Sequence, residues 1–530
     1  MSIWVKQVGY VHPDKEILFR DIDFSVRSKD KVALIGNNGS GKSILLQILS
    51  GELTASSGSV VCSSTPYYVP QHFGQYGAVT VAEALQIDKK TDALRRILAG
   101  NGSIDDFTIL DDDWTVEERA IAALSFWGME KIPLSYNLNS LSGGEKTCVF
   151  LSGILIHSPE IILLDEPTNH LDSDNRNRLY DFVRSSSLTM VVVSHDRTLL
   201  NLLPVTYELE RSAIKCYGGN YEFYREQKDQ ETAALYAGLE ERKKELRLVK
   251  KVAREVAERK QKRNTRAPED AKKAGIGKMA MNTMKNKSER SSFRLKEVHE
   301  EKLSAVYGEV NHLRNLLPDT RLMKTNISSS LLHNGKILIS GKNINYSYSG
   351  KTLWKKALNF QIKSGDRLSV RGKNGSGKTT LLKLIIGALQ PTAGTLEKAD
   401  FKYLYLDQEY SIINDDMSVF EQIRQFGSGL SDDVLRTILS RFLFPYDVWN
   451  KSCAGLSGGE KIRLSLCCLT VNENTPDMLI LDEPTNNIDV RNMDILLTAV
   501  QEYKGALLLV SHDEYFISRA NIGYFIDLDI

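Results

Sequence analysis

A glycine-rich octapeptide that occurs twice constrains this chain more than any other feature. The first copy is Gly36-Asn37-Asn38-Gly39-Ser40-Gly41-Lys42-Ser43, and the second, 336 positions later, is Gly372-Lys373-Asn374-Gly375-Ser376-Gly377-Lys378-Thr379. Each copy follows a β-rich run, at 31–35 and 366–371, and precedes an apolar helical run, at 44–49 and 381–389. This order of strand, loop and helix is the context that a phosphate-binding loop requires. Two copies in the same context make a chance match negligible.

The residue types of the two loops predict what each one binds. Glycines allow backbone N–H groups to surround phosphates, and the following helix presents its positive N-terminal end. We expect Lys42 and Lys378 to reach the outer phosphates, and Ser43 and Thr379 to bind Mg²⁺. We also expect Thr380, which directly follows the second loop, to contact the nucleotide. The sequence therefore predicts two sites for a nucleoside triphosphate with Mg²⁺.

Length and composition fit a duplicated intracellular chain. At roughly 100–200 residues per domain, a chain of 530 residues suggests three or four units. Its longest apolar runs, such as 161–164 and 507–510, are far shorter than the ~18 residues of a membrane span. The N-terminus lacks the features of a secretory signal, and the six cysteines contain no CxxC pair, which argues against disulfide, zinc and iron–sulfur frameworks. We expect a reduced, cytoplasmic protein.

The charge of the chain is concentrated in one segment. Residues 242–296 carry 20 Lys and Arg against 6 Asp and Glu, a local net charge of +14 that leaves −13 for the rest of the chain. Single lysines and arginines are usually no more than solvated surface. A cluster of this density is better explained by a phosphate-rich partner.

Aromatic and amide side chains recur around both loops. Tyr10 precedes the first loop, and Tyr346 and Tyr348 occupy the corresponding place in the second half. A ring here could stack on a base or be an ordinary strand aromatic; we take Tyr10 and Tyr348 as candidates, although the sequence leaves the choice between Tyr346 and Tyr348 open. Gln71 and Gln408 each end a predicted strand, 337 positions apart. That recurrence favours a metal or water contact.

A second helix start follows each phosphate loop. The two segments are Leu141-Ser142-Gly143-Gly144-Glu145 and Leu456-Ser457-Gly458-Gly459-Glu460. The serine is placed as an N-cap, and the two glycines allow close approach of the backbone. Each half therefore has a second helix end suited to anions.

An apolar strand in each half is predicted to end in two carboxylates. Residues 161–164 precede Asp165 and Glu166, and residues 478–481 precede Asp482 and Glu483. Continuous apolar runs of this length are typical of buried parallel strands. We expect each aspartate to belong to the Mg²⁺ shell and each glutamate to orient or deprotonate the attacking water.

A second apolar strand in each half ends in Ser-His-Asp. The histidines are His195 and His512, each 29 residues beyond its glutamate. One histidine after an apolar run is more often structural. Two at the same offset are better interpreted as contacts to the γ-phosphate.

This ordered set of motifs, present twice, resembles the ATP-binding cassette superfamily. The resemblance covers essentially everything outside residues 222–331. It implies two α/β cassettes with the P-loop NTPase fold, and ATP as the nucleotide. It also implies that the cassettes meet head to tail, with each ATP between the phosphate loop of one and the LSGGE helix of the other.

The resemblance also predicts which residues share a site. The first site would contain Lys42, Ser43, Gln71, Asp165, Glu166, His195, Ser457, Gly458 and Gly459. The second would contain Lys378, Thr379, Gln408, Asp482, Glu483, His512, Ser142, Gly143 and Gly144. Both glutamates and both histidines are present, so neither site looks degenerate. Asn487 and Ile488 stand where the first half has His170 and Leu171, so the sites are inequivalent, and the sequence leaves open which one is slower.

The middle of the chain has the pattern of a charged helical hairpin. Apolar residues spaced by three, four or seven form two stripes: Leu239, Leu246, Val249, Ala253 and Val256, then Leu303, Val306, Val310, Leu313 and Leu317. Both stripes fit a coiled-coil seam. Pro268, Gly275, Gly277 and the segment Met279-Ala280-Met281-Asn282-Thr283-Met284 predict a turn within 261–287. About forty residues at ~1.5 Å each give an arm of ~60 Å. The predicted units are cassette 1 at 1–221, the arm at 222–331 and cassette 2 at 332–530.

Tandem cassettes joined by a basic hairpin, without a membrane span, resemble the ABC-F family of translation factors and ribosome-protection proteins. The segment Gly218-Gly219-Asn220-Tyr221 and the use of LSGGE in place of LSGGQ are also similar to that family. The resemblance implies a monomer whose cassettes pair with each other and whose ATP-closed form binds the ribosomal tRNA exit site. The arm would reach towards peptidyl-tRNA and the peptidyl transferase centre, and hydrolysis would release the protein. The long tip resembles the antibiotic-resistance members.

Two other functions could use tandem cassettes. A soluble subunit that energises a separate membrane transporter explains the cassettes but not the basic arm. A DNA-maintenance ATPase could use the arm, but such proteins often carry zinc cysteines or very long coiled coils. An acidic insertion around 100–114 is not an obvious RNA-binding element. A ribosome-acting ATPase accounts for more of these features than either alternative.

Overall fold

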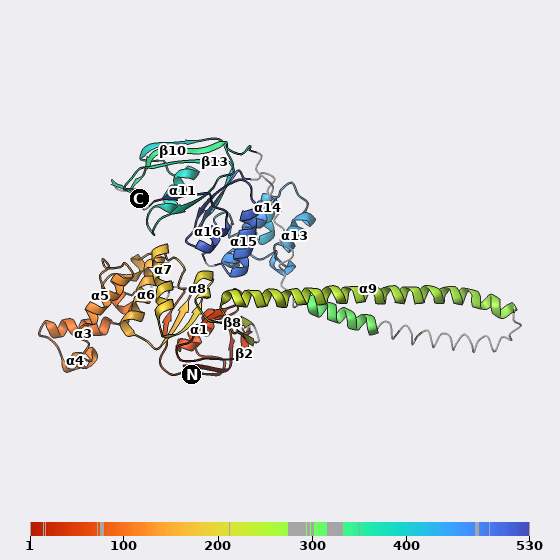
Figure 1. The fold of residues 1–530 in the computed structure, drawn as a ribbon, viewed down its shortest axis with the longest axis horizontal. Helices are drawn as coiled ribbons and strands as arrows, with labels where there is room; N and C mark the ends of the chain where they lie inside the picture. Colours follow the sequence, from red (N-terminus) through yellow and green to blue (C-terminus); the bar gives the residue numbers. More distant parts are fainter. Residues whose placement is uncertain are drawn as a thin grey trace. The chain divides into compact units, whose positions relative to one another are not determined.

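The computed structural model describes residues 2–13, 15, 17–71, 73–74, 79–210, 213–273, 293, 297, 301–314, 332–348, 350–471, 476–486 and 488–528 (Figure 1). The chain divides into two compact units. One comprises Met1–Phe223 with Leu322–Ile530, and the other is Tyr224–Arg321. The first unit contains both cassettes and the second is the arm.

The first cassette is built on a six-stranded sheet of order β5-β6-β7-β3-β8-β9. Its strands are β5 (Tyr67–Val69), β6 (Ile161–Asp165), β7 (Thr189–Val193), β3 (Lys31–Ile35), β8 (Val205–Glu210) and β9 (Ala213–Tyr217). All neighbours are parallel except β8 and β9. Both β6 and β7 are completely buried, because parallel strands are covered on both faces. A smaller antiparallel sheet comprises β2 (Ile17–Val26), β1 (Ile3–Val11) and β4 (Ser57–Cys62).

The second cassette repeats this plan. Its five-stranded parallel sheet has the order β16-β17-β18-β14-β19. The strands are β16 (Tyr403–Leu406), β17 (Met478–Asp482), β18 (Ala506–Val510), β14 (Arg367–Arg371) and β19 (Tyr524–Asp527). The antiparallel sheet comprises β13 (Leu358–Lys363), β10 (Ile337–Asn345) and β15 (Ala393–Lys398). A two-stranded hairpin of β11 (Ser347–Tyr348) and β12 (Lys351–Thr352) follows β10 in the chain.

The order of the strands brings the predicted motifs together. In each sheet the strand before the phosphate loop, β3 or β14, neighbours the strand that ends in Ser-His-Asp, which in turn neighbours the strand that ends in Asp-Glu. Because parallel strands end at one edge, the loops that follow them converge there. The helices α1 (Lys42–Ser50) and α11 (Lys378–Ile386) start directly after the glycines.

One glycine in each loop is required by the fold. Gly41 and Gly377 cap these helices with φ of 96° and 93°, a left-handed conformation that side chains disfavour. A Cβ on Gly41 would lie 2.7 Å from the side chains of Leu18 and Phe19, and a Cβ on Gly377 would lie 2.4 Å from Leu353. The backbone therefore passes close against the antiparallel sheet in both cassettes.

The remaining helices cover the sheets and form the insertion. In the first cassette they are α2 (Val81–Ala84), α3 (Asp88–Leu98), α4 (Ile104–Leu110), α5 (Val116–Phe126), α6 (Gly143–His157), α7 (Ser173–Ser185) and α8 (Arg197–Asn201). In the second they are α12 (Val419–Phe426), α13 (Asp432–Arg441), α14 (Gly458–Val471), α15 (Val490–Glu502) and α16 (Glu514–Arg519). The acidic insertion expected around 100–114 lies between α3 and α5 and contains α4. Arg96 of α3 pairs with Asp106 at 2.5 Å, and Arg119 of α5 pairs with Asp113 at 2.6 Å.

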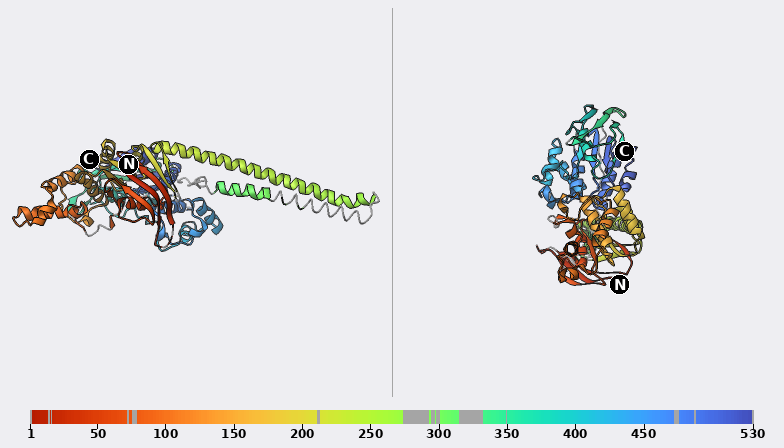
Figure 2. Two further views of the ribbon diagram at one scale, coloured as in Figure 1. Left: turned by 90° about the horizontal axis from the view of Figure 1, so that it is seen from below. Right: turned by 90° about the vertical axis from the view of Figure 1, so that its left-hand side faces the viewer.

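The arm unit is organised around one long helix, α9 (Tyr221–Lys273). Residues 301–314 form a second helical stretch that lies alongside it (Figure 2). Leu239, Val306 and Val310 are buried between the two, with Leu246 and Leu313 packed against them. The seam therefore uses residues of both predicted stripes.

The arm differs from its predicted form in length. Of the range 261–287, within which a turn is expected, residues 261–273 belong to α9, which continues through Pro268, and the rest lies outside the described residues. The 53 residues of α9 at ~1.5 Å each span ~80 Å, longer than the predicted ~60 Å. The segment 279–284, Gly275, Gly277 and Leu317 lie outside the described residues.

Candidate active sites

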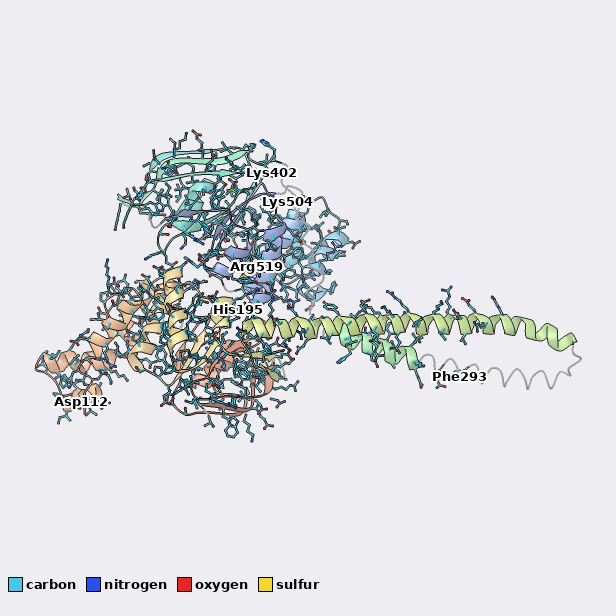
Figure 3. All side chains as sticks on the ribbon, in the orientation of Figure 1. Asp112, His195, Phe293, Lys402, Lys504 and Arg519 are labelled. Carbon is cyan, nitrogen blue, oxygen red and sulfur yellow. The ribbon has the colours of Figure 1, made fainter. Side chains whose placement is uncertain are left out.

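The first candidate site is a cavity of 660 Å³ at the carboxyl edge of the first parallel sheet. Its predicted lining residues are Asn38, Gly39, Gly41, Lys42, Ser43, Gln71, Asp165, Glu166 and His195 from the first cassette, with Ser457 and Gly458 from the second. Figure 3 marks His195 where the two cassettes meet. We call this cavity site 1. It combines the two halves of the chain in the predicted way.

The second candidate site, site 2, is a cavity of 520 Å³ with the roles of the cassettes exchanged. From the second cassette it is lined by Tyr348, Lys373, Asn374, Gly375, Gly377, Lys378, Thr379, Thr380, Gln408, Asp482, Glu483 and His512. From the first cassette it is lined by Ser142, Gly143 and Gly144. The head-to-tail arrangement is thus the same on both sides.

Tyr10, the expected base-stacking residue, does not line site 1. Its ring packs 6.4 Å from the ring of Phe19, against the core. His12 and Leu18 line the cavity instead. The pairing of β1 with β2 shifts register at Val8 and again at Tyr10, and each such bulge changes which face a side chain takes.

In the second cassette the two candidate tyrosines have different surroundings. Tyr346 packs against the core, whereas Tyr348 lines site 2 and its hydroxyl lies 3.2 Å from Thr380 Oγ1.

Some predicted residues of the loops and LSGGE segments lie beside the cavities rather than on their walls: Gly36, Asn37, Ser40, Gly372, Ser376 and Gly459. Gly36 and Gly372 still contribute backbone carbonyls. Lys42 Nζ donates to Gly36 O at 2.9 Å, and Lys378 Nζ donates to Gly372 O at 2.7 Å. Each lysine is therefore hydrogen-bonded to the first glycine of its own phosphate loop.

Burial lowers the pKa of Lys42, while Glu166, Asp489 and Asp165 oppose that shift. Phosphate oxygens would be strong acceptors for a lysine in this position.

The donor set beside each loop fits Mg²⁺. In site 2, Thr379 Oγ1 donates to Asp482 Oδ2 at 3.2 Å. Two oxygens that bind one Mg²⁺ at ~2.1 Å in octahedral geometry lie roughly 3 Å apart. No group of three or more His, Cys, Asp and Glu that could hold a metal occurs in the part of the chain that the structure describes. One carboxylate with a hydroxyl suits an ion whose shell is completed by phosphates.

The two glutamates are buried and unusually basic. Burial raises the pKa of Glu166 to about 8 and that of Glu483 to about 7. Both residues have positive φ, 50° and 49°, which for a side-chain-bearing residue costs on the order of 1–3 kcal/mol and is common at functional sites. Carboxylates with a pKa near neutrality are suited to accept a proton from water.

Each glutamate has a histidine beside it. His195 Nε2 lies 3.3 Å from Glu166 Oε1, and His512 Nε2 lies 3.4 Å from Glu483 Oε1. Burial, with Lys42 or Lys378 nearby, lowers the pKa of both histidines to about 3. The histidines are therefore neutral and can act as hydrogen-bond partners rather than as cations.

The LSGGE serines cap their helices as the sequence indicates. Ser142 N and Oγ donate to Glu145 Oε2 at 2.7 and 2.8 Å, and Ser457 makes the same pair of bonds to Glu460 at 2.9 and 2.7 Å. The glutamate of the motif thus fixes the serine at the start of the helix, where an anion is favoured.

Contacts between the cassettes differ at the two sites. At site 2, Asn374 Nδ2 donates to His170 O at 2.7 Å, and Lys373 Nζ pairs with Asp174 at 2.8 Å. The expected departure at Asn487 lies outside the described residues. Ile488 is buried, as is its counterpart Leu171.

Arg176 is an interface residue that the sequence analysis missed. Its side chain is buried, Nε donates to Leu171 O at 3.1 Å, and Nη1 donates across to His512 O at 3.2 Å. Its counterpart in the second half is Met493. A single arginine in an amphipathic helix looks like a solvated residue, and the asymmetry with Met493 was the one available signal.

Two phosphate cradles on parallel α/β sheets, each completed by the LSGGE helix of the other half, define a tandem ATP-binding cassette protein. A family model described as ABC transporter matches residues 19–169 and 355–486, together more than half of the chain. The chain is 30% identical to the putative ATP-binding protein YdiF of Bacillus subtilis (strain 168), over 95% of this chain and 76% of that protein. It is 27% identical to ABC transporter F family member 5 of Arabidopsis thaliana, over 95% of this chain and 71% of that protein.

Among solved structures, the archaeal ribosome recycling factor aABCE1, in complex with the ribosomal stalk protein aP1, matches 98% of this chain and 87% of its own with a TM-score of 0.59 and 17% identity. That likeness supports the fold. This chain belongs to the ATP-binding cassette family and is of the ABC-F type. The predicted α/β fold with two cassettes is confirmed, and these are ATP-binding and hydrolysing cassettes.

Proposed function

We propose that this protein is a Mg²⁺-dependent ATPase that binds the ribosome in its ATP-closed state and acts on translation through its arm. The observation that carries the proposal is a strongly basic two-helix arm inserted between two composite ATP sites. The closed cassettes would bind at the tRNA exit site, in the cytoplasm. The arm would contact rRNA and peptidyl-tRNA near the peptidyl transferase centre, and would regulate translation or protect the ribosome from an antibiotic.

The arm supports a nucleic-acid partner through its exposed cations. Lys244, Arg247 and Lys251 are exposed on α9, at spacings of three and four residues. Positions i, i+3 and i+7 lie on one face of a helix, so the three cations share a face. This face differs from the one that carries Leu239 and Leu246 at the seam. Lysine and arginine in such an array contact phosphates and release counterions.

The sites support ATP hydrolysis as the step that ends binding. Ser43 with Asp165, and Thr379 with Asp482, would hold Mg²⁺, with Gln71 and Gln408 beside them. The ion would neutralise charge on the β- and γ-phosphates. Lys42 and Lys378 would bind the outer phosphates, and the serines and glycines of the opposite LSGGE helix would cover them. Glu166 and Glu483 would take the proton of the attacking water.

One comparison with a solved structure lends support. One solved structure with this fold, at 17% identity, is described as a model of ribosome-bound archaeal Pelota and ABCE1. No helix in the described ranges is both long and apolar enough to cross a membrane.

Co-sedimentation with ribosomes tests the proposal. The variant Glu166→Gln with Glu483→Gln should remain closed on ATP and sediment with ribosomes in ATP but not in ADP. Replacing Lys244, Arg247 and Lys251 by Gln should weaken sedimentation by about tenfold and reduce its salt dependence. The matched control neutralises Glu241 and Glu255, which are exposed on the same helix, and should not weaken binding.

Other outcomes would reject the proposal. Unchanged sedimentation without the three cations would remove the arm from the interaction. Co-purification of the trapped variant with a membrane protein or with DNA would favour one of the alternative functions. A susceptibility panel in cells that express the protein tests protection against antibiotics.

A further inference from the structure

A third cavity lies next to site 1 and is not needed to hold ATP. It has a volume of 390 Å³ and shares Asn38, Gly39 and Ser457 with site 1. Its remaining walls come largely from the starts of α14 and α15 and include Arg463, Arg491 and Asn492. At ~30 Å³ per water molecule, a small hydrated ion fits in this volume.

The arginines of this cavity are incompletely satisfied. Within the described part of the chain, Nε and Nη2 of Arg491 are buried and have no hydrogen-bond partner, and the same holds for Nε of Arg463. Nη1 of Arg463 donates to two backbone carbonyls, Phe442 O at 3.3 Å and Leu443 O at 3.1 Å. Burial lowers the pKa of Arg463, and the like charge of Arg491 adds to that shift. An anion between the two would relieve both effects.

Two carboxylates also line the cavity. Glu460 Oε1 lies 3.8 Å from Arg463 Nη2 and opposes the shift of the Arg463 pKa, and both carboxylates serve as helix caps. Glu460 accepts from the backbone and hydroxyl of Ser457, and Asp489 Oδ1 accepts from Asn492 N at 2.7 Å. They stabilise the positive ends of α14 and α15. The buried guanidinium nitrogens remain available to an anion that enters from site 1 or from solvent.

The corresponding residues at site 2 have a different chemistry. The counterparts of Arg463 and Arg491 are Cys148 and Asp174, and the counterpart of Asn37 is Lys373. Lys373 and Asp174 form an ion pair, so the cation there is on the phosphate loop and is neutralised across the interface. Two arginines on the LSGGE side therefore distinguish site 1.

We propose that the cavity between Arg463 and Arg491 is a binding site for a phosphate-class oxyanion, specific to site 1. Arginine is suited to this because its planar donors match the oxygens of phosphate. The anion is either inorganic phosphate that leaves site 1 after hydrolysis or phosphate from solution. The first of these two sources rests on the proposed ATP hydrolysis at site 1, whereas binding of the anion itself does not.

Equilibrium dialysis of the full-length, ADP-loaded protein against radiolabelled inorganic phosphate tests the site directly. Arg491→Gln should weaken phosphate binding by about tenfold, the effect of losing one charged donor, and Arg491→Lys should retain more of it. Asp174→Asn, at the matching position of site 2, is the control and should leave binding within about twofold. The double variant Asn37→Lys with Arg491→Asp places the lysine and aspartate of site 2 at the matching positions of site 1, and it should also lose phosphate binding.

A second measurement identifies the source. In the Glu483→Gln protein only site 1 turns over, and retention of label from γ-labelled ATP after rapid gel filtration assigns the site to product phosphate. Dialysis binding without such retention assigns it to phosphate from solution. Phosphate binding that is absent from the parent protein, or unchanged in Arg491→Gln with an unaltered melting temperature, overturns the site. A protein that hydrolyses no ATP refutes the proposed ATPase but leaves the dialysis result readable.

Discussion

Sites 1 and 2 contain the same reacting groups but differ in the charged residues at their rims. Site 2 is closed by Asn374 on His170 O and by the pair of Lys373 with Asp174. Beside site 1, the loop carries Asn37 opposite two arginines and a cavity remains. The two halves therefore share the groups that would bind the nucleotide and activate water, while the charged residues at the rims of the two sites differ. The two sites can differ in how long they stay closed without differing in chemistry.

The electrostatics of the two glutamates differ for an identifiable reason. Both have a pKa raised mainly by burial, but Arg176 opposes the shift at Glu483, where the pKa is about 7. At Glu166, where it is about 8, Lys42 provides the main opposing charge. Met493 stands in the place that corresponds to Arg176, so site 1 has an uncharged side chain at the position that carries this opposing charge at site 2.

The largest expected effect tests whether the two sites share a mechanism. Glu166→Gln with Glu483→Gln should lower the rate of phosphate release by about 10²–10⁴-fold, the usual contribution of a general base. Binding of ATP should persist, because the lysines and serines are unchanged. A rate within tenfold of the parent protein would remove both glutamates from the role of base.

A smaller effect should distinguish the glycines of the two LSGGE segments, Gly144 at site 2 and Gly459 at site 1. Gly144→Ala places a Cβ 2.4 Å from His170 O and 2.8 Å from Asn374 Nδ2, at the closing contact of site 2. Gly459→Ala meets the side chain of Asn492, which belongs to the same cassette and makes no part of the contact between the two cassettes at site 2. Overpacking of 1–3 kcal/mol predicts about a tenfold loss of ATP affinity for Gly144→Ala, and less for Gly459→Ala. Equal losses, measured by nucleotide titration, would contradict the distinction.

The stability of the nucleotide-free protein should depend on pH through the same glutamates. Their folded-state pKa is above the unfolded value, so the folded state keeps protons that the unfolded state releases, and stability falls as the pH rises from ~4.5 to 7 or 8. The slope is at most ~1.4 kcal/mol per pH unit for each carboxyl. The buried neutral histidines act in the opposite sense below pH ~6.5. Denaturant melts of Glu166→Gln with Glu483→Gln should therefore lose stability more steeply on acidification than the parent; identical slopes would contradict the raised pKa values.

The smallest expected effect concerns the ion pair at site 2. Lys373 and Asp174 are 62% and 55% exposed, and exposed pairs contribute about 0–1 kcal/mol. Lys373→Gln should therefore change ATP affinity by less than about fivefold, and exchanging the two charges should restore it. A larger loss would make this pair, rather than the glycine contact, the main closure of site 2.

The sequence predicted the features that repeat and missed those that do not. Residues that recur at one offset, such as Glu166 and Glu483, were found because the same chemistry requires them in both halves. His12 corresponds, at the phosphate-loop offset of 336, to Tyr348 at site 2, but the residue types differ, and the bulges of β1 are invisible in an alternation of apolar residues. Leu18 did have a signal, since Leu353 precedes the second loop at nearly the same distance.

The arm and the interface show two further limits. Heptad spacing identified the seam at Leu239 and Val310, but a proline inside a charged segment was a poor guide to where α9 ends. Arg463 and Arg491 were missed because they lie on two different helices, α14 and α15, and spacing within one helix does not show which other helix packs beside it.

Arg176 has a consequence for how the two sites act together. One guanidinium holds Leu171 O of its own cassette and His512 O of the other, and lies 3.9 Å from Asp196, next to His195. Parting the cassettes would remove His512 O, the acceptor of this buried cation across the interface. Losing a partner of a buried charge costs far more than losing an exposed contact. The two cassettes should accordingly separate in one concerted step. The nucleotide bound at one site would then set how long the nucleotide at the other site stays bound.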